Sequence, residues 1–145
     1  MKLTEPMYAK GLSFVMAAGL VKAHEGHRFV YLHLLCQGFE NIGKALLLLK
    51  DDEKYGPMLQ PTYGHNLETL LAELKTIYGQ DLMSNEASAD VAQLNAFYKK
   101  HQLRYGDKLD FAAPASTLQA DSLHTELVSL LGKKNEVFAL LRRDA

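Results

Sequence analysis

The chain has 145 residues, and its 16 basic and 17 acidic side chains give a formal net charge of −1. This length favours a single domain, residues 1–145, with one hydrophobic core. The balanced charge excludes a strong overall attraction to nucleic acid, although it leaves room for a local basic patch.

Two helices are predicted at about residues 6–24 and 27–50. The first follows Pro6, a residue suited to the first helical turn, and Gly26 marks the break between the two. His24 and His27 flank this break and could hold a metal, but no further Cys or His clusters near them. The charged connection that follows contains Gly and Pro, so an irregular surface path is predicted over 58–63.

Three further helical segments complete the chain. Asn66 is a natural N-cap for a helix that ends at Gly79, and Ser84 or Asn85 caps a helix at about 86–103. A capping-box spacing at 116–119 opens the last helix, which Gly132 bends or interrupts. No stretch has the alternation of a strand. The sequence therefore predicts an all-α, up-and-down bundle of four to five helices.

The helix at 27–50 is the most apolar part of the chain, yet it carries a file of polar residues. His33, Gln37, Glu40 and Lys44 follow one another at spacings of three or four and therefore share one face. A mostly apolar helix is normally buried, so this file must be paired or must line a cavity. Glu40 and Lys44 could form an internal ion pair, or Lys44 could meet an anion in a ligand cleft that Glu40 orients.

The single cysteine, Cys36, excludes an internal disulfide, and its apolar surroundings indicate a buried thiol. Cysteine usage of this kind fits a reducing cytoplasm, where we expect the protein to be located. No segment has the features of a signal peptide, and the apolar run at 45–49 is too short to cross a bilayer. No association with a membrane is expected.

Three short motifs carry a resemblance to a known family. They are Glu40 followed by Lys44-Ala45-Leu46, then Gly64-His65-Asn66-Leu67, then Leu103-Arg104-Tyr105. In this order they resemble the signature motifs of the HEPN superfamily of nucleotide-binding helical bundles. The resemblance covers about residues 6–105. It implies a HEPN-like bundle that frequently forms homodimers and is tied to RNA, nucleotides, or a nucleotidyltransferase or antitoxin partner in toxin–antitoxin or defence systems.

The ribonuclease motif of the family is not found at its usual place. Active members carry an Arg and, after four to six residues, a His on a late helix, but no His follows Arg104 at that distance. Arg28 and His33 have this spacing, but they lie at the start of the second helix and point about 140° apart. The family's catalytic activity is therefore not carried over.

The expected ligand-binding residues combine the polar file with the other motifs: His33, Gln37, Glu40, Lys44, His65, Arg104 and Tyr105. His65 could bond to Glu40, or it could help free N–H groups at a helix start to hold a phosphate. A short basic cluster, Lys99, Lys100, His101 and Arg104, is either an RNA backbone patch or a solvated face. No metal or cofactor is expected.

The leading hypothesis is a non-catalytic, HEPN-like module that binds a nucleotide, RNA or a partner protein. One alternative is a divergent, metal-independent ribonuclease that uses Arg104 with His101, or Arg28 with His33. The other alternative is a purely structural dimerisation or interaction protein, in which Glu40 and Lys44 are only an internal pair.

Overall fold

The computed structural model describes residues 3–100, 103 and 118–143, and all regular structure in this part of the chain is helical. The predicted all-α class is confirmed. The α-helices are α1 (Thr4–Ala23), α2 (Arg28–Lys50), α3 (Asp52–Tyr55), α4 (Leu67–Tyr78), α5 (Asn85–Tyr98), α7 (Asp121–Val128) and α8 (Lys134–Arg143). Short helical segments of other types are η1 (Gly56–Met58), η2 (Leu59–Tyr63) and η3 (Gln80–Leu82).

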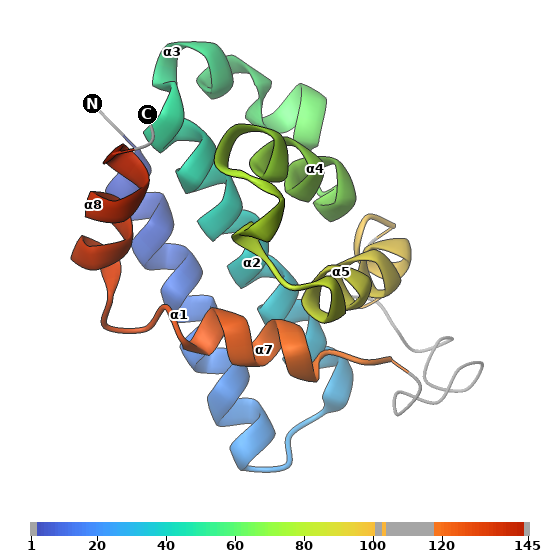
Figure 1. The fold of residues 1–145 in the computed structure, drawn as a ribbon. Helices are drawn as coiled ribbons and strands as arrows, with labels where there is room; N and C mark the ends of the chain where they lie inside the picture. Colours follow the sequence, from blue (N-terminus) through green and yellow to red (C-terminus); the bar gives the residue numbers. More distant parts are fainter. Residues whose placement is uncertain (1–2, 101–102, 104–117, 144–145) are drawn as a thin grey trace.

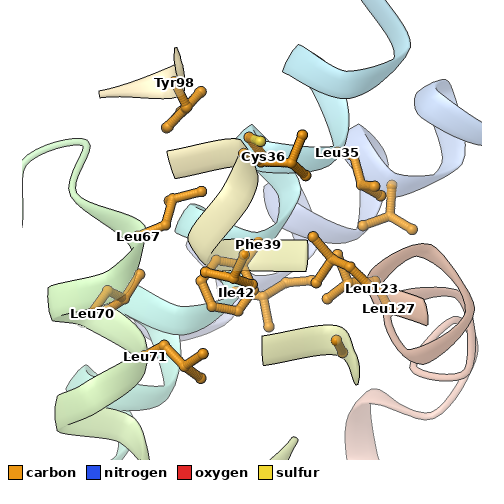
Figure 2. Close-up of a cluster of buried hydrophobic side chains, with 14 of the residues drawn as sticks. Leu35, Cys36, Phe39, Ile42, Leu67, Leu70, Leu71, Tyr98, Leu123 and Leu127 are labelled. Atoms are coloured by element: carbon orange, nitrogen blue, oxygen red, sulfur yellow. The ribbon is translucent and has the colours of Figure 1, made fainter. Parts of the chain in front are cut away.

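Helix α2 crosses the middle of the molecule, with α1 along one side and α4, α5 and α7 around it (Figure 1). Figure 2 shows Phe39 of α2 between Leu71 of α4 and the leucines of α7, Leu123 and Leu127. From Leu35 to Leu48 nearly every α2 residue is buried, so the helix is enclosed on all sides. The prediction of a buried central helix is confirmed, and its polar file must be accommodated inside the fold.

Buried polar residues of α5 hold the N-termini of two neighbouring helices. Asn95 accepts a 2.7 Å hydrogen bond from the backbone N–H of Leu67 at the start of α4, and Asp90 accepts one of 3.1 Å from Leu123 in α7. Helix α7 needs this support because its N-cap residue, Ala120, has no capping side chain. Asn95 and Asp90 of α5 therefore cap the N-termini of helices that are distant in sequence but adjacent in the fold.

The predicted N-caps of α4 and α5 are confirmed. Asn66 accepts a 3.2 Å bond from the N–H of Thr69, and Ser84 accepts one of 3.1 Å from the N–H of Ala87. The irregular path predicted over 58–63 is wrong in conformation, because η1 and η2 are helical, although Gln60, Pro61 and Thr62 are exposed as predicted. This segment continues the helical turns η1 and η2, and the buried Tyr63 ties it to the core.

The predicted ends of the later helices also need correction. Helix α5 ends at Tyr98 instead of 103. Tyr98 and Leu103 are both buried, but five residues of helix would turn them about 140° apart, so a continuous helix would not bury both on one face. Ser116 lies outside the described residues, and α7 begins only at Asp121. Gly132, with φ 76°, separates α7 from α8, which confirms the predicted interruption.

The contact between α7 and α2 predicts a pH dependence of stability. The buried Tyr31 hydroxyl lies 2.8 Å from Nδ1 of His124, within hydrogen-bond distance, and burial raises the pKa of Tyr31 to about 12, so the hydroxyl keeps its proton. Burial, and next the charge of Lys22, lower the pKa of His124 below its usual value, while Asp121 acts in the opposite direction. Below the ordinary histidine pKa, the unfolded chain therefore binds more protons at this site.

The free energy of unfolding should consequently fall as the pH falls from about 8 to about 5. Replacing His124 with glutamine keeps a hydrogen-bonding partner for Tyr31 but removes the titration, so the decline should be shallower in the His124→Gln variant. Urea unfolding of both proteins across this pH range measures the difference. If the free energy of unfolding fell equally steeply with pH in the two proteins, the lowered pKa of His124 would be contradicted.

Candidate functional site

Glu40 is the centre of a buried polar cluster. One carboxylate oxygen, Oε1, lies 2.7 Å from Nδ1 of His65 and accepts a 3.0 Å hydrogen bond from the Tyr98 hydroxyl. The other oxygen, Oε2, lies 3.4 Å from Nζ of Lys44. A carboxylate can only accept hydrogen bonds, so His65 must present the N–H form of Nδ1 to it. The predicted contacts of Glu40 with Lys44 and with His65 are both present.

Lys44 is buried beneath the connection between α2 and α4. Its side chain is 7% exposed, and Nζ lies 3.4 Å from the side-chain oxygen of Gln60 as well as 3.4 Å from Glu40. Both separations exceed the usual length of a hydrogen bond, so charge attraction contributes more than hydrogen-bond geometry. Gln60 thus covers Lys44 and links it to η2.

Tyr98 joins the two histidines of the cluster. Its ring centroid lies 5.6 Å from that of His33 and 5.7 Å from that of His65, and the second contact is edge-on. Burial first, and then the neighbouring charge of Glu40, raise the pKa of Tyr98 well above its usual value. Tyr98 therefore remains a hydrogen-bond donor, which suits it to orienting the carboxylate.

The other predicted site residues have different positions. Gln37 is half-buried, and no side-chain hydrogen bond joins it to the cluster in the described part of the chain. Arg104, Tyr105 and His101 lie outside the described residues. Arg28 donates a 2.7 Å hydrogen bond to the carbonyl oxygen of Leu118, whereas His33 packs against Tyr98, so these two residues have different neighbours.

Sequence reasoning assigned no role in the site to Tyr98 or Gln60. Tyr98 belongs to the buried face of α5 with Val91 and Leu94, and a tyrosine on such a face carries a hydroxyl that needs a partner. This need for a hydrogen-bond partner was the feature of the sequence that could have indicated a role for Tyr98 in the site. Gln60 had no comparable signal, because only the fold of the connection brings it above Lys44.

The exposed edge of this cluster faces a shallow depression of about 370 Å³. The His65 side chain is 43% exposed, and Lys99 and Lys100 at the end of α5 are exposed as well. Neither lysine has an ion-pair partner within the described residues. The lining consists of Gln60, Pro61, Thr62, Tyr63, Gly64, His65, Asn66, Lys99 and Lys100. Buried Glu40 and Lys44 lie behind this surface and are not among its lining residues.

The backbone N–H groups at the start of α4 offer little for binding an anion in this depression. The expectation of free N–H groups beside His65 is wrong for two of them, because Asn95 accepts from Leu67 and Asn66 accepts from Thr69. Glu68 also places a negative charge in the first turn. Lysine ammonium groups and His65, more than the helix start, make this surface suited to an anion.

The remaining candidates for chemistry have structural surroundings. His27 is the N-cap of α2, and its Nδ1 accepts a 3.1 Å hydrogen bond from the N–H of Phe29. No cluster of three or more potential metal-ligating side chains occurs among residues 3–100, 103 and 118–141. Cys36 is buried as predicted, and this burial raises the pKa of its thiol.

Comparison of the chain with protein-family models, curated proteins and solved structures finds no match. None of the described helices is both long enough and apolar enough to cross a membrane.

Proposed function

We propose that the chain is a non-catalytic, HEPN-like binding module whose ligand is single-stranded RNA or a nucleotide. Phosphate groups would bind in the depression beside His65. The observation that carries the proposal is the pair Lys99 and Lys100, which share this hollow with His65 and have no ion-pair partner in the described part of the chain. Lysine ammonium groups are well suited to phosphate as point charges.

The buried cluster supports such a site as a set of positioning residues. Glu40 orients His65 through the 2.7 Å contact at Nδ1, and Tyr98 holds Glu40 in turn. A ring fixed in this way presents its exposed edge to the depression with little loss of freedom on binding. Lys44 balances the charge of Glu40 inside the fold. The polar file therefore acts through His65 and not by direct contact with the ligand.

The family resemblance supports the choice of ligand and the finer description of the fold as a HEPN-like bundle of four to five principal helices. It also motivates a cytoplasmic role beside a nucleotidyltransferase or antitoxin partner. Pairing of two copies would rest on α1, where Met16 and Leu20 are 57% and 63% exposed one turn apart. These points remain predictions.

Binding of RNA should depend on the two lysines. A labelled single strand of about 12 nucleotides would be titrated with protein at several salt concentrations, and fluorescence anisotropy would report binding. We expect the Lys99→Ala/Lys100→Ala variant to bind roughly tenfold more weakly. Its slope of log affinity against log salt should be smaller by about 1.4, because two phosphate contacts are lost.

The matched control is Lys133→Ala/Lys134→Ala, which removes the same charge at the start of α8, on the other side of the molecule from α5 (Figure 1). This variant should keep the affinity and the salt slope of the unchanged protein. Equal loss in both variants would reduce the effect to net charge and refute the site. Competition by ATP would favour a nucleotide ligand, and shortening of the RNA would favour the ribonuclease alternative.

A further inference from the structure

A second cavity lies on the other side of α2 and shares no lining residue with the depression beside His65. Its volume is about 260 Å³, and it lies between α1, α2, α4, η3, α7 and α8. The wall is formed almost entirely by aliphatic and aromatic side chains, among them Phe39 and Ile42 of α2 and Leu71 of α4, which Figure 2 shows close together. Leu140 of the wall is 60% exposed, so the cavity reaches the surface at α8.

One polar group in this wall lacks a partner. Tyr8 is fully buried, and its hydroxyl makes no hydrogen bond with any described residue. The ring is fixed by an edge-on contact with Phe138 at 5.0 Å. Burial raises the pKa of Tyr8 to about 12, so the phenol keeps its proton and can donate. An unsatisfied buried hydroxyl is costly, and a bound acceptor would remove that cost.

We propose that this cavity binds a small, uncharged apolar molecule that carries a single hydrogen-bond acceptor, which receives the Tyr8 hydroxyl. An apolar cavity of about 150 Å³ stays dry and holds benzene, so by proportion about ten non-hydrogen atoms fit here. An anionic headgroup is excluded because the lining holds no basic side chain, and its one charged residue, Glu126, is acidic. The Tyr8 hydroxyl is buried, so side chains of the wall must adjust before a ligand can reach it, and the unbranched Met83 is suited to this.

The probe is 2-nonanone, an uncharged ketone of the required size with one acceptor, and octanoate is the charged comparison. In a thermal melt, 2-nonanone should raise the melting temperature of the unchanged protein with increasing concentration, whereas octanoate should not. Tyr8→Phe keeps the wall but removes the donor, and it should bind the ketone roughly fivefold more weakly. Leu130→Phe places extra volume at the wall and should abolish the shift.

Leu3→Phe is the control for the last variant, because Leu3 is 49% exposed just before α1 and does not line the cavity. It should respond to the ketone like the unchanged protein. Absence of any shift with 2-nonanone, or an undiminished shift in Leu130→Phe, would overturn the proposal. It would also fail if the unliganded protein sedimented as a dimer and Leu130→Phe as a monomer, because the cavity would then belong to an interface between two copies.

Discussion

Replacing Glu40 with leucine is expected to lower the free energy of unfolding by about 3–5 kcal/mol, because the change leaves a buried charge without its partner. The Lys44 side chain is 7% exposed, and its remaining contact, the Gln60 oxygen, is 3.4 Å away. Tyr98 would lose its acceptor as well. Urea unfolding followed by circular dichroism measures the loss. Glu40→Gln, which keeps a side-chain oxygen for Tyr98, should be less damaging.

The double variant Glu40→Leu/Lys44→Met separates charge burial from lost packing. Removing both ions should recover a large part of the stability, because buried ion pairs contribute little beyond their apolar replacements. Recovery should remain incomplete, since a buried Tyr98 hydroxyl without an acceptor still costs about 1–3 kcal/mol. A double variant no more stable than Glu40→Leu would show that the uncompensated lysine is not the cause.

This double variant also distinguishes a structural cluster from a functional one. If Glu40 serves only the fold, the recovered protein should bind RNA like the unchanged protein. If Glu40 positions His65, binding should remain weakened although the protein is folded. Because His65 contributes an exposed edge next to Lys99 and Lys100, this comparison asks whether its orientation matters.

Local patterns in the sequence were sufficient to predict the class of the fold. Apolar spacing marked the helices, and Asn66 and Ser84 marked two of their starts because a cap depends on residues only three positions away. At 58–63 the turn residues correctly indicated an exposed stretch, since Gln60, Pro61 and Thr62 are exposed, but they did not indicate its helical turns. Burial of Tyr63 against other helices decided its structure, and no local pattern reports such a contact.

In the candidate site, too, contacts within one helix could be predicted from the sequence, whereas most contacts between distant segments could not. Glu40 and Lys44 lie one turn apart on a single helix, so their contact follows from helix geometry. The contacts of Glu40 with His65 and Tyr98 span 25 and 58 residues of sequence. The first was anticipated as one of two roles for His65, and the second was not anticipated. Arg104 and Tyr105 lie outside the described residues, so their part in the site remains a prediction.

Replacing Gly11 with alanine is expected to destabilise the protein by about 2 kcal/mol, although alanine is the better helix former. Gly11 lies where α1 packs closely against α2, and a Cβ atom there would come within 2.8 Å of the backbone nitrogen of Ile42. It would also lie 2.7 Å from Cγ1 of that side chain. Backbone cannot turn aside as a side chain can, so the two helices would have to separate along a fully buried contact.

Gly19→Ala is the matched control, since it changes the same residue type in the same helix where the nearest atom, Nε2 of His124, is 3.9 Å away. It should raise the free energy of unfolding by about 0.5–1 kcal/mol through helix propensity alone. Removing the Cγ1 contact as well, in Gly11→Ala/Ile42→Ala, should leave the cost of Gly11→Ala unchanged relative to Ile42→Ala alone, because the backbone nitrogen of residue 42 stays in place. A Gly11→Ala change that costs nothing in the Ile42→Ala background would place the clash in the side chain. Similar effects of Gly11→Ala and Gly19→Ala would refute the close approach of α1 and α2.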